Sequence, residues 1–251
     1  MSNNLKRGIT MNEEKVKLLL LDVNLARREA KNGIEKIERG IRDIADELYG
    51  PHDVPSGPTP PPQEPVTALL LVGHNEYYDS GAEATNGIAE WPFNNGVAVR
   101  AQSRLAIIDP SISLPIIRRP SVSSYNEQIR AAAGEAKTYG AKIIVLMHFN
   151  DSDNKRASGA EVYCSEWENN PLAKMLVSMI CAEFDLPNRG VRKPNRGSSM
   201  IESMEDVGIE HVFLLESFFG SNESDVEKVM VDDGERLAGV LAKWVAWAAR
   251  Q

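Results

Sequence analysis

His148 stands where an apolar run ends, which is a favourable position for a side chain that does chemistry. The run, residues 143–147, follows the helix breaker Gly140 and is rich in β-branched residues, so we expect a buried strand. In open α/β sheets, ligand sites are built at the ends of buried strands. A neutral imidazole there can act as a base or bind a metal. A lone histidine more often caps a strand by bonding to backbone, so the interpretation depends on whether other reactive groups accompany it.

Three further residues occupy comparable positions. His74 follows the apolar run 67–72, and Glu216 ends another apolar run. Glu90 precedes Pro92 at the expected start of a helix, where its carboxylate could equally serve only the helix dipole.

Two imidazoles and a carboxylate are a recurring catalytic zinc set, which leaves the fourth position open for water. The metal lowers the pKa of that water and polarises a carbonyl, and a second carboxylate that is not a ligand can act as general base. The sequence has no His-Glu-x-x-His pattern, so such ligands would have to come from separate elements.

Strands and helices alternate over the C-terminal three quarters of the chain. Besides the strands named above, the pattern predicts strands at 114–117 and 159–164 and helices beginning near Pro92, Asn126, Asn170 and Asp232. Residues 188–192 have the composition of a polar loop, and a long polar stretch follows as far as about Ile209. This alternation predicts an α/β fold with one mostly parallel or mixed twisted sheet, covered by helices on both faces.

The N-terminal segment has a different pattern. Within residues 16–48, apolar side chains recur at spacings of three and four, with Arg27 as the exception, and charges of both signs flank them. This predicts a coiled-coil-like helical arm over residues 1–49 that forms a homo-oligomer through 16–48; the alternative is an amphipathic helix lying on the following domain. Residues 50–65 contain seven of the 14 prolines, which predicts an extended linker before a catalytic domain over 66–251.

The composition argues against several classes of function. A net charge of −8 is unfavourable for a broad nucleic-acid footprint. The only apolar run near the N-terminus, residues 18–21, is too short for a signal peptide or a membrane span, so we expect synthesis in the cytoplasm and no membrane insertion. Cys164 and Cys181 match neither a disulfide framework nor a metal-binding spacing and are expected to be buried.

Several short motifs follow one another in a set order along residues 67–250. They are Gly73-His74-Asn75 with Gly81-Ala82, Glu90 with Asn94, Met147-His148-Phe149-Asn150, Gly159 to Tyr163, Asn188-Arg189-Gly190-Val191, and Leu215-Glu216 to Asn222 with Asp225. This series resembles the zinc-dependent N-acetylmuramoyl-L-alanine amidases of the type 3 amidase family. One departure is that the family usually has Gly-His-Gly-Gly where this chain has Gly-His-Asn-Glu from Gly73, which affects the rim of the site and the substrate preference.

The resemblance implies roles for individual residues. It implies that Zn²⁺ would be bound by His74, Glu90 and His148, and that Glu216 would be the catalytic acid/base. It also implies the substrate-binding residues Asn150, Arg189 and Asn222. The implied reaction is hydrolysis of the amide between N-acetylmuramic acid and L-alanine in peptidoglycan.

The arm, the linker and the lack of a recognisable signal peptide indicate a phage endolysin-like layout, in which the protein acts on the cell wall after release. Two alternatives stay open: another zinc peptidase that acts on peptidoglycan peptides, and a non-catalytic wall-binding module oligomerised by its arm. Retention of Glu216 argues against the second, because a binding module does not need a general base.

Overall fold

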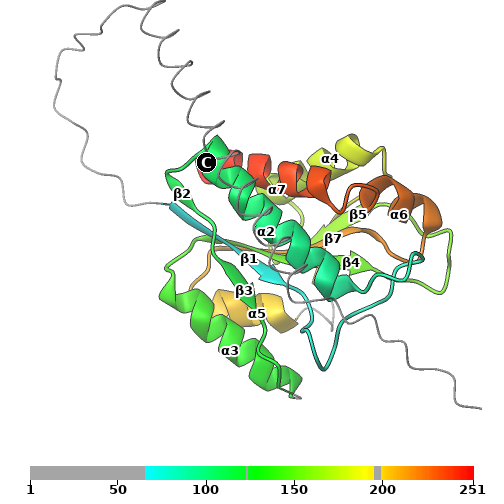
Figure 1. The fold of residues 1–251 in the computed structure, drawn as a ribbon. Coiled ribbons are helices and arrows are strands. Elements are labelled where there is room, and N and C mark those ends of the chain that lie inside the picture. Colours follow the sequence, from blue (N-terminus) through cyan, green and yellow to red (C-terminus); the bar gives the residue numbers. More distant parts are fainter. Residues whose placement is uncertain (1–65, 123, 195–198) are drawn as a thin grey trace, which may run out of the picture. The chain divides into compact units, whose positions relative to one another are not determined.

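The computed structural model describes residues 66–122, 124–194 and 199–251 (Figure 1). The predicted arm over 1–49 and linker over 50–65 lie outside these residues, so the predictions about them stay predictions. No helix in the described part of the chain is both long enough and apolar enough to cross a membrane.

The described strands form one mixed sheet. They are β1 (Val66–Val72), β2 (Ile112–Ser113), β3 (Ile116–Arg118), β4 (Ile143–Asn150), β5 (Ala160–Tyr163), β6 (Asn188–Arg192) and β7 (His211–Phe219). The strand order is β2-β1-β4-β7-β5-β6, with β3 also paired to β1. Every pairing is parallel except that of β5 with β7. The predicted mostly parallel or mixed sheet is therefore confirmed.

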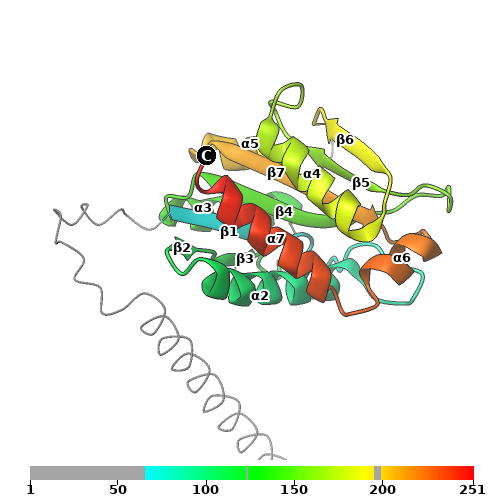
Figure 2. The same ribbon diagram turned by 90° about the horizontal axis from the view of Figure 1, so that it is seen from above.

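Helices cover both faces of this sheet. They are α2 (Glu90–Ile108), α3 (Tyr125–Thr138), α4 (Pro171–Phe184), α5 (Ser199–Asp206), α6 (Glu223–Val229) and α7 (Glu235–Ala248). Helices α3 and α5 lie on one face, and α2, α4 and α7 lie on the other (Figures 1 and 2). Strand β4 serves both cores, because its side chains alternate: Val145 and Met147 pack with α2, α4 and α7, whereas Ile144 and Leu146 pack with α3 and α5.

Three elements differ from the sequence-based expectation. Residues 188–192, expected to be a loop, form the edge strand β6. Because none of its residues is fully buried, its sequence does not show the alternation of apolar and polar residues that marks a half-buried strand. Helix α5 lies within the expected polar stretch and buries only Met200, Ile201 and Met204. Of the strand expected at 114–117, only the last two residues belong to a strand, β3; Leu114 and Pro115 lie between β2 and β3, and Pro115 has no backbone N–H for a sheet ladder.

Candidate active site

The register of the parallel strands brings the candidate residues together. Met147 of β4 pairs with the last residue of β1 and with Leu215 of β7. The next residues along these two strands, His148 and Glu216, are also paired. Paired residues project from the same face of a sheet, on strands about 4.8 Å apart. His74 lies two residues beyond the end of β1. The three predicted residues His74, His148 and Glu216 therefore lie near the carboxyl ends of the adjacent strands β1, β4 and β7.

His74, Glu90 and His148 form a compact cluster, with one ligand atom from each lying within 4.8 Å of the others. Oε1 of Glu90 is 2.8 Å from Nδ1 of His148, and Oε2 is 3.1 Å from Nε2 of His74. Atoms bound to one zinc at about 2.0–2.1 Å in a tetrahedron are about 3.3 Å apart. The donor types and their separations therefore fit a zinc ion.

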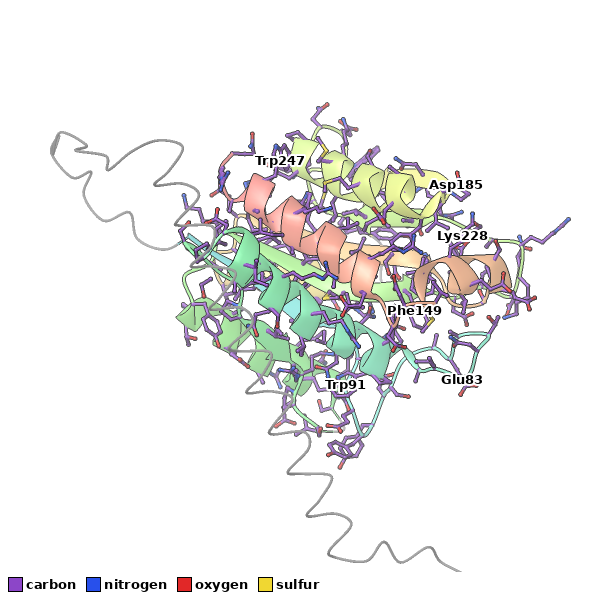
Figure 3. All side chains as sticks on the ribbon, turned by 45° about the horizontal axis from the view of Figure 1, so that its top comes forward. Glu83, Trp91, Phe149, Asp185, Lys228 and Trp247 are labelled. Atoms are coloured by element: carbon purple, nitrogen blue, oxygen red, sulfur yellow. The ribbon has the colours of Figure 1, made fainter. Side chains whose placement is uncertain are left out.

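Helix α2 places the carboxylate of Glu90 between the two histidine rings. Glu90 is the first residue of the helix and is 2% exposed. Its carboxylate accepts hydrogen bonds from the backbone N–H groups of Phe149 (3.2 Å) and Ala82 (3.3 Å). One turn later, Nδ2 of Asn94 donates to the Met147 carbonyl at 3.3 Å, which attaches the helix to the end of β4. Figure 3 shows Phe149 near this end of α2.

The charges in the cluster favour an ionised carboxylate between the two imidazoles. Burial opposes ionisation of Glu90, but hydrogen bonds and Coulombic attraction to His148 and His74 outweigh it and lower the pKa of Glu90 to about 2. Burial also acts to lower the pKa of His74, but Glu90 and Asp79 outweigh it and raise that pKa. A proton and a metal cation would therefore compete for the same imidazole.

The backbone of His74 is held in an unusual conformation. Its φ of 62° lies in the left-handed region, which non-glycine residues rarely occupy outside special sites. Oδ2 of Asp79 is 3.0 Å from Nδ1 of His74, and buried Arg119 donates from Nε to the His74 carbonyl at 2.8 Å. Nη2 of Arg119 is also 3.8 Å from Oδ2 of Asp79. These contacts fix the ring orientation and leave Nε2 directed to Glu90, as partners of metal-binding histidines commonly do.

Two glycines of the motif are required by this close packing. A Cβ on Gly73 would collide with the His148 ring and the Met147 carbonyl. Gly81 has a φ of +80°, and its Cβ would lie 2.6 Å from Cβ of Glu90 and 2.7 Å from Cδ2 of His74. Only glycine allows such an approach without displacing the candidate ligands.

Glu216 is a carboxylate with an unsatisfied oxygen. The residue is half-buried as a whole, but its Oε2 is inaccessible and has no hydrogen-bond partner among the described residues. Burial raises its pKa well above the ordinary value, and the nearby carboxylates of Glu90 and Glu161 raise it further. An unpaired carboxylate with a raised pKa beside a candidate metal site is suited to exchange protons.

Glu161 connects two of the predicted substrate-binding residues. It is buried and lies opposite Glu216 in the β5–β7 ladder. Its Oε1 accepts from Nδ2 of Asn150 at 2.7 Å, and its Oε2 accepts from Nε of Arg189 at 2.9 Å. The Arg189 guanidinium also lies over the Phe219 ring, 4.9 Å from its centroid. The side chains of Asn150, at the end of β4, and Arg189, in β6, thus meet at Glu161, next to Glu216.

Asn222, the third predicted substrate-binding residue, has other contacts. It is the N-cap of α6, where its Oδ1 accepts from the backbone N–H of Asp225 at 3.1 Å. Its Nδ2 donates to the carbonyls of Lys155 (3.2 Å) and Ala157 (3.0 Å). These bonds hold the loop between β4 and β5, and the predicted role of Asn222 in substrate binding stays a prediction.

Sequence reasoning missed three members of this arrangement: Asp79, Arg119 and Glu161. Asp79 carries a usable signal, because it is a carboxylate in the polar loop between His74 and Gly81. Glu161 carries another, because it is the one charged residue in an apolar strand. Nothing in the Arg118-Arg119 pair indicates which side chain is buried.

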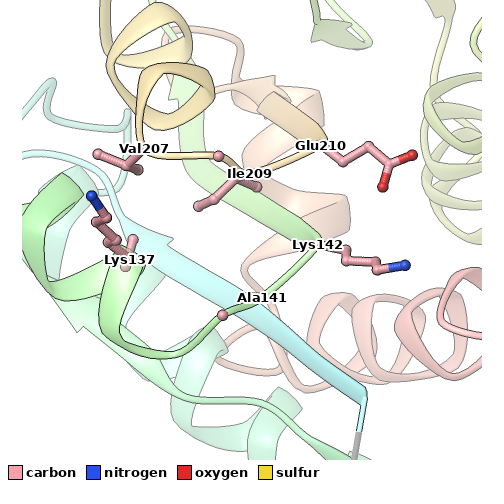
Figure 4. A pocket seen from close by; sticks show the side chains of 9 residues that line it. Lys137, Ala141, Lys142, Val207, Ile209 and Glu210 are labelled. Carbon is pink, nitrogen blue, oxygen red and sulfur yellow. The ribbon is translucent and has the colours of Figure 1, made fainter.

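A separate hollow of about 270 Å³ lies away from these residues (Figure 4). Its lining includes Lys137, Lys142 and Glu210, next to the amino ends of β4 and β7. None of the candidate site residues lines it.

The fold and the site together define a class of protein: an α/β domain with a candidate metal triad beside a carboxylate that has one oxygen without a partner among the described residues, arranged for hydrolytic chemistry. The sequence matches the N-acetylmuramoyl-L-alanine amidase family, Amidase_3, over residues 69–244. This match spans more than half of the chain, and the chain belongs to that family. Comparison with curated proteins gives no match.

Solved amidase structures share the fold. An N-acetylmuramoyl-L-alanine amidase from Clostridium difficile 630 has a TM-score of 0.60 at 18% identity, covering 75% of this chain and 99% of its own. The catalytic domain of CwlV, an amidase from Bacillus (Paenibacillus) polymyxa, has a TM-score of 0.56 at 21% identity, covering 74% and 98%. The catalytic domain of the CD27L endolysin, which targets Clostridium difficile, has a TM-score of 0.60 at 19% identity, covering 72% and 97%. These similarities confirm the α/β architecture.

Proposed function

We propose that this protein is a zinc-dependent hydrolase that cleaves the amide between the lactyl group of N-acetylmuramic acid and L-alanine in peptidoglycan. The observation that carries the proposal is the convergence of ligand atoms of His74, Glu90 and His148 within 4.8 Å of one another, beside Glu216, whose Oε2 has no hydrogen-bond partner among the described residues. Family membership supports the choice of substrate. Residues 66–251 are the proposed catalytic domain.

The proposed metal ligands are His74 through Nε2, His148 through Nδ1, and the Glu90 carboxylate. Three protein ligands are characteristic of a catalytic zinc site, whereas structural sites have four. Zinc bound there would polarise the amide carbonyl and lower the pKa of water. Asp79 and Arg119 would keep His74 in the orientation that binding requires.

Glu216 is the proposed acid/base. Hydrolysis adds the oxygen of water to the carbonyl carbon, breaks the carbon–nitrogen bond and transfers a proton to the departing nitrogen. A carboxylate that is not a metal ligand can accept the proton from water and then deliver it to that nitrogen. The raised pKa of Glu216 makes its protonated form a usable acid at a higher pH than an ordinary carboxyl group allows.

Asn150 and Arg189 are proposed to contact the substrate beside Glu216. Their positions are set by Glu161, and the Arg189 side chain remains 34% exposed, so it can reach a bound molecule. Arginine and amide groups on this side suit the carboxylates and peptide groups of the stem peptide. The arm over 16–48 is proposed to oligomerise the enzyme, and the layout is proposed to be that of a phage endolysin acting on the wall after release.

The test combines metal analysis with product analysis on purified cell walls. Wild-type protein should contain stoichiometric zinc, release new L-alanine N-termini and leave muramic acid intact. His148→Ala should remain folded and lose most of its zinc. Glu216→Gln should retain zinc, while turnover falls by about 10² to 10⁴-fold, the usual share of general acid–base catalysis.

Glu210→Gln is the matched control, because Glu210 is a 62% exposed carboxylate next to the start of β7, at the other end of the same strand. It should leave zinc content and turnover unchanged. Release of other amino termini would instead identify a peptidase. Wall binding without cleavage by zinc-loaded protein would identify a binding module, and near-normal turnover of zinc-loaded Glu216→Gln would remove Glu216 from the mechanism.

A further inference from the structure

Two adjacent tyrosines are displayed beside the candidate metal site. Tyr77 is 73% exposed and Tyr78 is 63% exposed, the highest values among aromatic side chains in the described residues. Adjacent exposed aromatic rings offer a larger apolar surface than a single exposed side chain, and apolar surface rimmed by polar residues is typical of binding sites. Both directly follow Asn75 and Glu76, where this chain departs from the Gly-His-Gly-Gly pattern usual in its family.

The loop that carries them is organised by Asn75. This side chain is fully buried, and its Oδ1 accepts from the backbone N–H groups of Tyr77 (3.2 Å) and Tyr78 (2.8 Å). The backbone N–H of Asn75 donates to the Asp79 carbonyl at 2.8 Å, which closes the turn. The hydrogen bonds leave both rings outside a turn whose backbone is already ordered. Little ordering would therefore be needed when a ligand packs on them.

The same loop is attached to the candidate metal site. Asp79 directly follows the tyrosines and lies 3.0 Å from the ring of His74. The next residue, Ser80, accepts through its carbonyl a hydrogen bond from the backbone N–H of Trp91 at 2.9 Å, beside Glu90. The loop that carries the two tyrosines thus borders the site, directly after β1.

The reaction requires a sugar ring close to the metal triad. In the proposed substrate, the scissile carbonyl belongs to a lactyl group joined by an ether oxygen to muramic acid. When that carbonyl reaches the triad, the ring can be only a few bonds away. The apolar face of a pyranose packs well on an aromatic face, and the phenolic groups can bond to its rim hydroxyls.

The strand order determines which side of the site suits the sugar. Arg189, held by Glu161, lies on the β5–β6 side, whereas the tyrosines lie beyond β1 at the other side. The tyrosine loop also carries the carboxylates of Glu76 and Asp79, which repel an acidic stem peptide. Complementarity therefore favours peptide on the arginine side and glycan on the tyrosine side.

We propose that Tyr77 and Tyr78 form a sugar-binding subsite that packs against the glycan strand of peptidoglycan. The inference rests on the proposed amidase function and assigns the glycan side of that site. The two rings supply affinity for the strand, and Asn75 holds them in position.

The experiment measures binding of the full chain to peptide-free glycan strands of alternating N-acetylglucosamine and N-acetylmuramic acid. These strands lack the amide, so binding is independent of catalysis. Isothermal titration should show about threefold to tenfold weaker binding for Tyr77→Ala and for Tyr78→Ala, and a larger loss for the double variant. Tyr→Phe variants should stay within about threefold of wild type, because the ring face is kept. Free stem peptide should bind equally to all variants.

Tyr139→Ala is the matched control, because Tyr139 is 40% exposed at the C-cap of α3, outside the candidate site. It should bind the strands like wild type. Zinc content and circular dichroism show whether each variant is folded, and the Phe variants provide the test if an Ala variant is not.

Unchanged glycan binding by the double variant, equal loss of peptide binding, or no binding by wild type would overturn the subsite. These outcomes are distinct from failure of the proposed function. Amidase activity with tyrosine-independent glycan binding would refute the subsite alone, whereas tyrosine-dependent glycan binding without amide cleavage would refute the amidase alone.

Discussion

Asp79→Ala is expected to weaken zinc binding without unfolding the protein. The Asp79 carboxylate is positioned to accept the Nδ1 proton of His74 at 3.0 Å, which leaves Nε2 free to bind a metal. Without this partner the ring can rotate or adopt the other tautomer. Arg119 would still hold the His74 carbonyl, so the backbone should keep its position.

The size of the effect follows from the exposure of the pair. A hydrogen bond to a charged group contributes about 1.5–3 kcal/mol when it is well formed. The Asp79 side chain is 49% exposed, so solvent screening reduces the expected value to about 1–1.5 kcal/mol. That corresponds to about fivefold to tenfold weaker zinc binding, near the low end of the range for residues that orient metal ligands.

The assay is competition for zinc with a chromophoric chelator at about pH 8, where protons compete least with the metal for His74. Asp79→Asn retains an oxygen acceptor and should recover part of the affinity. Glu210→Ala is the control, since it breaks a carboxylate–histidine pair of 3.8 Å at the other end of β7. A dissociation constant for Asp79→Ala within twofold of wild type would refute the orienting role.

Three further predictions concern the same site and the arm. Arg119→Met should lower zinc affinity about tenfold in the same competition assay, because the His74 carbonyl loses its donor; unchanged affinity would show that Asp79 alone orients the ring. The zinc-free protein should gain most stability from this pair of groups between pH 4.5 and 6.5. Glu90, with its lowered pKa, contributes stability that is lost as the pH falls toward 2, and His74, with its raised pKa, contributes stability that is lost as the pH rises through that raised value. Calorimetric melting temperatures should be nearly constant between these two pH values and should fall both below pH 4.5 and above pH 6.5, and Glu90→Gln should flatten both slopes; equal slopes in the two proteins would contradict the assignment. Light scattering should find full-length protein larger than one chain and protein lacking 1–65 monomeric; a monomeric full-length protein at tens of micromolar would favour the arm lying on its own domain.

The main elements around the site could be predicted because their signals are local. The strand before His148 is marked by an unbroken apolar run after Gly140, and the helix that carries Glu90 is marked by Pro92. Edge elements could not be predicted in this way. Strand β6 and helix α5 bury few side chains, so their sequences resemble those of loops, and their conformations depend on pairing with β5 and packing against β7.

The sequence by itself determined which residue types were available for hydrolytic chemistry and which buried strands carry His148 and Glu216, since apolar runs and chain breakers act over a few residues. Only the tertiary structure decided that these two residues are paired in register, because strand register depends on contacts between segments far apart in the chain. The supporting contacts are likewise tertiary. Arg119 reaches the His74 carbonyl from the loop directly after β3, and Glu161 meets Arg189 only because β5 and β6 are adjacent. Such contacts leave no periodic pattern, because a single side chain makes each of them across a large sequence separation.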